Sequence, residues 1–232
     1  VSLVSNDVPA HVRAAQGAGR GNEEVGNAIA IPRIKLLQKM SPEVDKYNAK
    51  YVEGADVGQF INSISNELYG EELYAISLKF KIEYVVWRSL DAGGGLLGNF
   101  ATQAEAEAEV AAQEKPSEYE IKDTHSHVLL LKNPESGELS HPIIMDFTSS
   151  KLRVSRSWNT QIASKGGDRF SSLWRLKSMP VESRTGAQFM NLDVEWVGWT
   201  MEEDYQRAEE LFQQFSSYCL LYTSPSPRDR PL

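Results

Sequence analysis

The residues best able to do chemistry in this chain lie in one basic stretch, Phe147 to Phe189. The protein of 232 residues carries a formal net charge of -8, yet cations outnumber carboxylates in this stretch. Aromatic rings, including Trp158, Phe170 and Trp174, are interleaved with the cations. Cationic side chains match a phosphate backbone, and flat rings can stack on unpaired bases. The basic stretch therefore predicts binding to single-stranded nucleic acid.

Individual roles follow from side-chain type. The cations expected to contact phosphates are Lys151, Arg153, Arg156, Lys165, Arg169, Arg175 and Lys177. The rings expected to stack on bases are Trp158, Phe170 and Trp174, together with Tyr84 and Trp87 from an upstream strand. The alternative is that the rings form the core while the cations form a solvated face. The sequence favours that alternative for Trp87, Trp196 and Trp199 and leaves Trp158 and Trp174 open.

A second pattern concerns metal-ligating side chains. Asp123, His125 and His127 alternate, so on a strand they share one face. Such a face could seat a metal ion, and His141 could lie opposite it in a hairpin. Histidines on a strand face are also ordinary polar surface, so we assign no metal ligands.

Catalytic signatures are absent from the sequence. The segment 91–100 contains GGGLLG, but no Lys-Ser or Lys-Thr pair follows it, so it is not a P-loop. No Ser-His-Asp or Cys-His set with a diagnostic local motif occurs. Glu105, Glu107 and Glu109 lie on a helix expected to be solvated, so they receive no acid–base role. We expect a protein that is not an enzyme and has no cofactor.

Composition sets the broad class. Hydrophobic residues make up 41% and charged residues 24%, as in ordinary globular proteins. No apolar run approaches the ~18 residues of a membrane span, and the N-terminus shows no secretory signal. The single cysteine, Cys219, excludes an internal disulfide. We expect a cytoplasmic protein that does not enter a membrane.

The two ends differ from the body in composition. Residues 1–28 are rich in small and polar residues, which predicts a flexible arm. Residues 216–232 abandon the preceding helical pattern and contain SPSP. This segment resembles a translated adapter or read-through at the end of an environmental sequence, and a natural disordered tail is the alternative.

The body, residues 29–215, alternates between strand and turn signals. Leu73–Arg88 is the strongest strand candidate, because it alternates and is rich in β-branched and aromatic residues. QFINSIS also reads as a strand, while IPRIKLLQ could form a strand or a short helix. Two hairpins are expected, from 125–131 with 139–147 and from 170–182 with 188–199.

Helices are expected at three places. An inserted helix at 101–115 has Thr102 as N-cap and Glu105 in a capping box. SSKLRVSRSWNTQIAS predicts a helix with Ser150 near its cap, and 201–215 predicts a last helix with Thr200 as N-cap. With five to seven strands and no regular βαβ alternation, the expected fold is mainly β with helical insertions. Its leading specific form is an OB-like small antiparallel barrel.

Several segments together resemble a known family. They are GRGNEEV, IPRIKLLQKMSPEVD, YVEGADVGQFINSI, YVVWR, DTHSHVLLL, SSKLRVSRSWNTQI, GGDRFSSLWRL and VEWVGW. They resemble tailed-phage single-stranded DNA-binding proteins of the OB-fold type, over about residues 20–215. The resemblance implies a role in phage DNA replication or recombination in the infected host cell. It also implies phage replication proteins as partners, and a homo-oligomer is possible. Such proteins often end in an acidic partner-recruiting tail, and this sequence shows none.

Two other functions stay open. The first is a phage virion or assembly protein with a β-sandwich and no nucleic-acid site, which the net charge of -8 favours slightly. The second is a nuclease, although no carboxylate cluster for metal ions stands out. Cations and rings on one concave face would favour DNA binding, whereas cations around a convex shell would favour the virion protein.

Overall fold

A computed structural model describes residues 31–183 and 185–218. The arm expected at 1–28 and the part of the expected tail after residue 218 lie outside the described residues. The strands are β1 (Arg33–Leu36), β2 (Phe60–Asn62), β3 (Leu68–Gly70), β4 (Glu72–Arg88), β5 (Leu96–Phe100), β6 (Tyr119–Leu131), β7 (Ile143–Thr148), β8 (Ser172–Glu182) and β9 (Gln188–Trp199). The helices are α2 (Gln103–Ala111), α3 (Lys151–Lys165) and α4 (Glu202–Tyr218), with short 3-10 turns at Pro42–Val44, Leu90–Ala92 and Pro116–Glu118.

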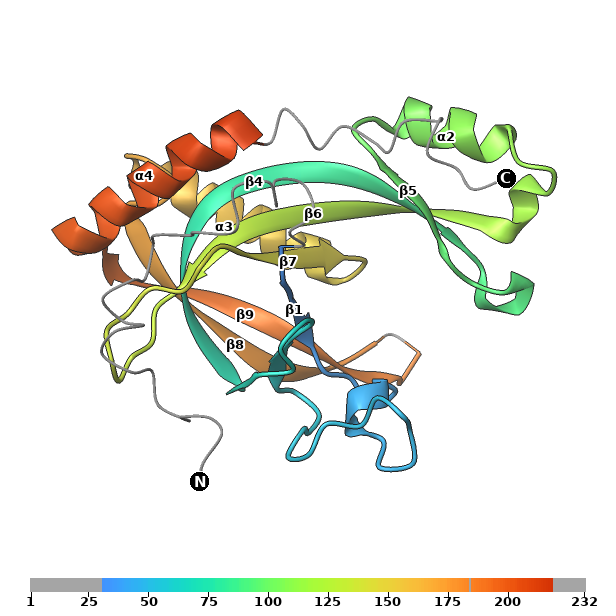
Figure 1. Ribbon diagram of the computed structural model, residues 1–232, viewed down its shortest axis with the longest axis horizontal. Helices are drawn as coiled ribbons and strands as arrows, with labels where there is room; N and C mark the ends of the chain where they lie inside the picture. The colour runs from blue at the N-terminus through green and yellow to red at the C-terminus, as the bar shows by residue number, and fades with distance from the viewer. Residues whose placement is uncertain (1–30, 184, 219–232) are drawn as a thin grey trace, which may run out of the picture. The chain divides into compact units, whose positions relative to one another are not determined.

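The nine strands of the described residues belong to one sheet, in the order β3-β2-β1-β7-β6-β4-β8-β9 with β5 paired to β4. Neighbours are antiparallel except β1 and β7, which are parallel. The sheet curls into a half-barrel (Figure 1). The expected class, mainly β with helical insertions, is confirmed. The expected number of strands, five to seven, was too low, because the short strands β3 and β5 lie among turn residues and were not predicted.

The long strand β4 organises the sheet. Residues Ala75–Arg88 pair with β6 along one edge. The other edge is shared, since β8 pairs with Glu72–Ile76 and β5 pairs with Tyr84–Trp87. Within the described residues, no strand pairs with 77–83 on that edge. The sheet therefore divides there, with β8 and β9 on one branch and β5 on the other (Figure 1).

The cap expected from the sequence is present at the start of α2 but not at the start of α4. Thr102 Oγ1 accepts from the Glu105 N–H at 3.2 Å, and Glu105 Oε2 accepts from the Thr102 N–H at 3.1 Å, which confirms the capping box of α2. The expected cap of α4 was wrong. Tyr205 N–H donates to Met201 O at 2.9 Å, so Met201 holds the cap position. The Thr200 hydroxyl instead donates to Phe170 O at 3.3 Å.

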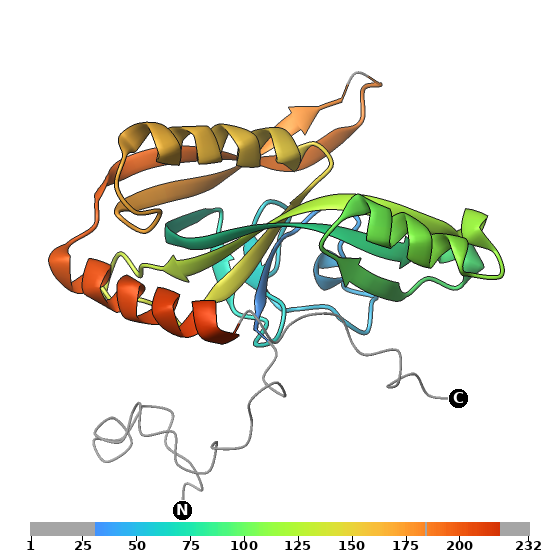
Figure 2. The same ribbon diagram turned by 90° about the horizontal axis from the view of Figure 1, so that it is seen from above.

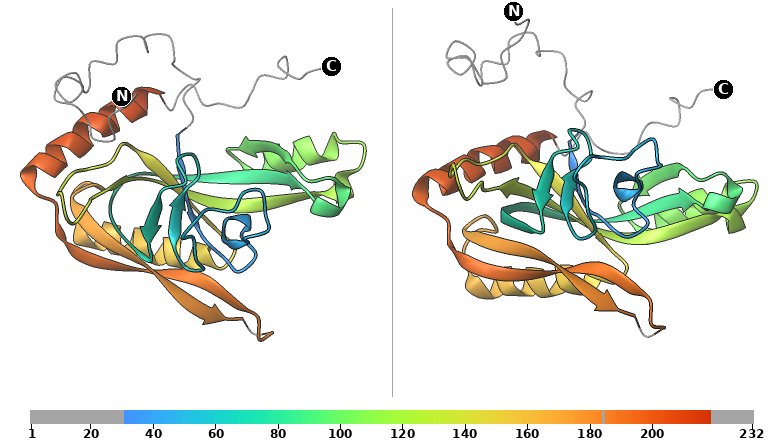
Figure 3. Two further views of the ribbon diagram at one scale, coloured as in Figure 1. Left: turned by 60° about the horizontal axis from the view of Figure 1, so that its bottom comes forward. Right: turned by 90° about the horizontal axis from the view of Figure 1, so that it is seen from below.

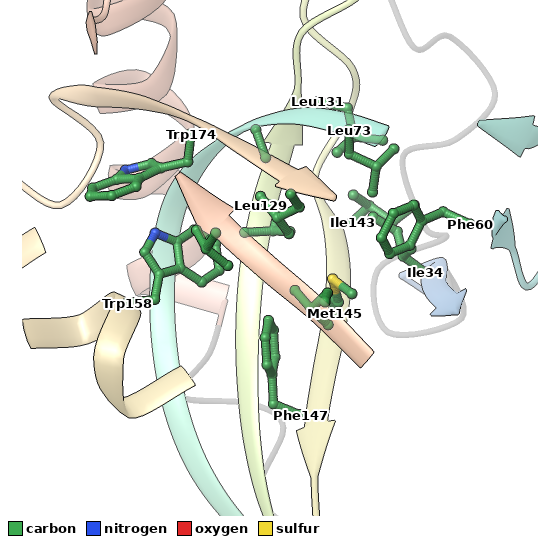
Figure 4. Close-up of a cluster of buried hydrophobic side chains, with 14 of the residues drawn as sticks. Ile34, Phe60, Leu73, Leu129, Leu131, Ile143, Met145, Phe147, Trp158 and Trp174 are labelled. Atoms are coloured by element: carbon green, nitrogen blue, oxygen red, sulfur yellow. The ribbon is translucent and has the colours of Figure 1, made fainter. Parts of the chain in front are cut away.

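The main core lies between one face of the sheet and α3 (Figure 4). Trp158 from α3 and Trp174 from β8 are both 0% exposed, with ring centroids 6.1 Å apart. Phe60, Leu129, Met145 and other strand residues surround them. Burying rings of this size contributes a large share of the free energy of folding.

A second, smaller core lies between the other face and α4. Phe170 packs there against Ala208, Leu211 and the ring of Tyr205. Lys132 Nζ is 2.7 Å from Asp204 Oδ1, which fastens the start of α4 to the end of β6. The two helices α3 and α4 therefore lie on opposite sides of the β4–β6 ribbon (Figure 2).

Side chains form hydrogen bonds with backbone groups on the outer edge of β9. Gln38 Nε2 donates to Met190 O at 2.9 Å, and Gln38 Oε1 accepts from Met190 N–H at 2.9 Å. The next two outward N–H groups, of Leu192 and Val194, donate to the side chains of the residues before them, each at 2.9 Å. Gly58, with φ of +91°, lets its loop approach this edge, because an added Cβ would lie 2.8 Å from Met190 Cε. The outward N–H groups of the last strand are therefore bonded to side chains from Met190 to Val194.

Candidate nucleic-acid interface

A cleft of about 510 Å³ lies between the β4–β6 ribbon and α3. We call it the α3 cleft, and it is lined by Phe80, Ile82, Tyr84, Asp123, His125, Arg156, Asn159 and Thr160. The sheet register places Ile82 opposite His125 and Tyr84 opposite Asp123. Because side chains alternate along a strand, these residues share one face and form the floor of the cleft.

Three side chains of the floor are apolar or aromatic: Phe80, Ile82 and Tyr84. Ile82 is 43% exposed, and the Phe80 and Tyr84 side chains are half-buried beside it. The floor lies next to the part of β4 whose edge has no strand partner among the described residues. Flat and apolar side chains at such a place can accept an unpaired base.

The opposite wall is the cationic side of α3. Ser155, Trp158 and Ile162 face the core, so Arg153 and Arg156 project outward. Arg156 Nη2 lies 3.8 Å from Asp123 Oδ2, and its side chain is 66% exposed. An exposed pair at this distance is weak, so Arg156 can still contact a phosphate. Within the described residues, Arg153 has no ion-pair partner.

A hydrogen-bonded network lies beneath the wall. Arg169 donates to Ser77 Oγ at 2.8 Å and to Asn159 Oδ1 at 2.6 Å, and it contacts His127 Nδ1 at 3.2 Å. The Ser155 hydroxyl lies 2.8 Å from His127 Nε2 and 2.8 Å from His125 Nδ1. Burial lowers the pKa of Arg169 to about 10, which still leaves it a cation at neutral pH. Arg169 therefore supports the cleft from below and is not offered to a phosphate.

The two network histidines are neutral at pH 7. Burial lowers the pKa of His127 well below its ordinary value, and the charge of Arg169 lowers it further. Burial also lowers the pKa of His125, opposed by Asp123. As expected, Asp123, His125 and His127 share a face. His141 was wrongly placed, because Phe147 and Met145 lie opposite the histidines. In the part of the chain that the structure describes, no group of three or more His, Cys, Asp or Glu residues could hold a metal ion.

Other predicted phosphate contacts lie elsewhere. Arg175 is bonded to Glu195 and lies 3.9 Å from Glu72, and Lys177 Nζ is 3.2 Å from Glu72. By strand alternation both cations lie on the face of β8 opposite Trp174. Lys151 is half-buried, and burial lowers its pKa. Lys165 Nζ sits 3.7 Å from the ring centroid of Trp196.

Three of the predicted stacking rings lie outside the cleft as well. Trp158 and Trp174 are 0% exposed and Phe170 is 5% exposed. A base could reach these three rings only if the core opened, so their burial argues against the stacking role. Trp158 instead stacks on His127, with ring centroids 4.5 Å apart.

The tryptophans for which the sequence favoured the core are exposed. Trp87 is 42% exposed, Trp196 37% and Trp199 55%. Trp87 pairs with Glu120 in the sheet, so it lies on the face opposite Tyr84 and outside the α3 cleft. Of the predicted site residues, the structure thus brings Tyr84 and Arg156 together, with Arg153 one helical turn away.

Four cleft residues were missed from the sequence: Phe80, Ile82, Asn159 and Thr160. Two signals could have found them. Phe80 and Ile82 precede Tyr84 at alternate positions of the strongest strand candidate, and Thr160 follows Arg156 by one helical turn. Asn159 also lies one helical turn from Arg156, although its contact with Arg169 could not be read from the sequence.

The sequence matches the Pam3 phage gp34-like protein family over residues 3–219. The chain belongs to this family. The expected phage origin is therefore supported, while DNA binding is not part of the match. No curated protein and no solved structure gave a match. Among the described residues, no helix is long and apolar enough to cross a membrane.

Proposed function

We propose that this protein is a non-enzymatic single-stranded DNA-binding protein that acts in phage DNA replication or recombination. The observation that carries the proposal is the pairing of an exposed apolar floor with a cationic helix face in the α3 cleft. The phage family and the resemblance of the sequence to phage single-stranded DNA-binding proteins support it.

In the proposed complex, unpaired bases lie on Ile82 and Tyr84 while the phosphates follow Arg153 and Arg156. A duplex keeps its bases stacked inside, so it offers the floor nothing to bind. The half-barrel would then present DNA on a curled sheet as an OB-like barrel does. The net charge of -8 opposes association at long range, so the affinity depends on these local cations and falls with salt.

Fluorescence anisotropy with labelled oligothymidine, against a duplex of the same length, tests the proposal. We expect the single strand to bind more tightly at low salt. Replacing Arg153 and Arg156 with Ala should weaken binding and reduce the salt slope by about 0.7 for each phosphate that is no longer neutralised. The matched control replaces Arg175 and Lys177 with Ala, which changes the net charge equally but outside the cleft. No binding at low salt, or equal effects of the two double variants, would contradict the proposal.

A phage virion or assembly protein is the second candidate. Its supporting observation is the exposed pair Trp196 and Trp199 on β9, with ring centroids 5.7 Å apart. Exposed tryptophans are common at protein interfaces. A protein that binds no oligonucleotide but is recovered with phage particles would favour this function.

A further inference from the structure

We propose that the α3 cleft reads one unpaired base through two hydrogen-bond donors, His125 Nε2 and Asn159 Nδ2, and therefore prefers thymine to adenine. Arg169 acts as the positioning residue that fixes both donors. The inference rests on the proposed function and adds a base preference to it.

The proton positions follow from the chemistry of Arg169. A guanidinium only donates, so His127 Nδ1, at 3.2 Å from Arg169 Nη2, must be an acceptor. The proton of a neutral His127 then lies on Nε2 and is donated to Ser155 Oγ at 2.8 Å. The Ser155 hydroxyl hydrogen is left for His125 Nδ1, also at 2.8 Å.

His125 therefore carries its proton on Nε2. Its Nδ1 is held by Ser155, so Nε2 is the ring nitrogen left for an occupant of the cleft that His125 lines. The same arginine fixes the amide of Asn159. Asn159 Oδ1 accepts from Arg169 at 2.6 Å, so Nδ2 is the group left to donate.

Two fixed donors at the edge of an apolar floor select an occupant that accepts hydrogen bonds. Thymine offers two carbonyl oxygens, one for each donor, and no exocyclic amine. Adenine offers single ring nitrogens as acceptors, and its amine lies beside N1 and N7, so a pair of donors placed for the two carbonyl oxygens of thymine would bring one donor against the amine. Asp123 does not discriminate between the two bases, because its Oδ1 is buried and its Oδ2 could accept from the N3–H of thymine or from the amine of adenine. A donor left unpaired in a partly buried cleft weakens binding, so the mismatch disfavours adenine.

The test compares the affinity of the full chain for oligothymidine and for oligodeoxyadenylate of the same length. We expect the wild type to prefer thymine on the order of tenfold. Asn159→Asp keeps the acceptor for Arg169 but replaces the Nδ2 donor with an acceptor, so the ratio should fall to about one or invert. The matched control is Gln161→Glu, the same amide-to-carboxylate change on α3, at a residue that does not line the cleft. It should leave the ratio unchanged.

The outcomes separate the two proposals. If the wild type binds no oligonucleotide, the proposed function fails. If it binds but shows no thymine preference, or if both variants change the ratio equally, the base-reading inference is overturned while DNA binding stands. Nitrogen-15 NMR of the histidine rings gives a readout independent of any variant. Protons on Nε2 of both His125 and His127 are expected, and a proton on Nδ1 of His125 would overturn the inference.

Discussion

Two pairs of tryptophans in this protein have almost the same geometry and opposite surroundings. Trp158 and Trp174 meet edge to face at 69° with centroids 6.1 Å apart, and both are 0% exposed. Trp196 and Trp199 meet edge to face at 79° with centroids 5.7 Å apart, and they are 37% and 55% exposed. The first pair lies between the sheet and α3, while the second lies at the end of the last strand, β9. The helix α3 runs beside β8 and β9 (Figure 3). The geometry of a ring pair therefore does not show whether the pair is buried or exposed. Burial depends on whether another layer of the fold, here α3, covers the rings.

The largest expected effect is on stability and separates the two pairs. Trp158→Ala should lower the free energy of unfolding by about 3–5 kcal/mol, because it leaves a cavity in the main core. Trp199→Ala should change it by less than about 0.5 kcal/mol, as a surface substitution does. Urea denaturation of both variants measures the difference. Similar destabilisation of the two would show that the exposed pair is also part of a folded contact.

The next effect is on the pH dependence of stability. It concerns His127, which stacks on the buried Trp158. The folded-state pKa of His127 lies well below its ordinary value through burial and Arg169, and burial also lowers that of His125. The unfolded chain therefore takes up protons first as the pH falls. The stability associated with these histidines should be complete above about pH 6.5 and decline below it.

Denaturation at several pH values checks this sign. His127→Gln should reduce the slope of stability against pH between about 7 and 5. His141→Gln, a change at an exposed histidine, should leave the slope unaltered. A wild-type protein more stable at pH 5 than at pH 7 would contradict the buried, neutral state of the network.

A smaller effect, on DNA affinity, tests which aromatic ring would stack on bases in the proposed complex. Tyr84→Ala should weaken binding of oligothymidine by about 1–3 kcal/mol with little change in the salt slope. Trp199→Ala should leave binding unaltered, because Trp199 does not line the α3 cleft. If the result were the reverse, the exposed pair would be the stacking surface, and the proposed path of the strand would have to move to β9.

The smallest effect concerns Lys165, whose Nζ lies over the Trp196 ring at 3.7 Å. Lys165→Ala should cost about 0.5–1 kcal/mol of stability, the usual value of an exposed cation–π contact. Lys165→Arg should restore it, because a guanidinium also binds a ring face. A large drop in DNA affinity in Lys165→Ala, with the fold intact, would instead assign Lys165 to phosphate binding.

Local signals predicted much of the fold. The alternation of Leu73–Arg88 indicated β4, Thr102 and Glu105 indicated the start of α2, and both long hairpins were placed correctly. These features depend on neighbours in the sequence, which a pattern records. The short strands β3 and β5 were missed, because they hold their places through partners in the sheet and not through their own composition.

The candidate site was harder to predict, because it depends on pairing over long distances in the chain. Glu72 and Glu195 neutralise Arg175, and Ser77 and Asn159 take the donors of Arg169. In the sequence both arginines simply count as cations, yet in the structure neither guanidinium is free to contact a phosphate. Only Tyr84 and Arg156 among the predicted residues keep a place in the cleft, because the alternation of β4 and the helical period of α3 put them there.

The side chains on the outer edge of β9 have a consequence for how neighbouring copies of the protein could meet. A protein that coats a DNA strand places many copies side by side, and a bare edge strand would let neighbouring sheets join through their backbones into an irreversible polymer. Gln38 occupies that edge at Met190, and the side chains of Asn191 and Asp193 occupy the next two donors. If copies pack along DNA as proposed, the segment Met190–Val194 of one copy would therefore not donate backbone hydrogen bonds to the sheet of its neighbour.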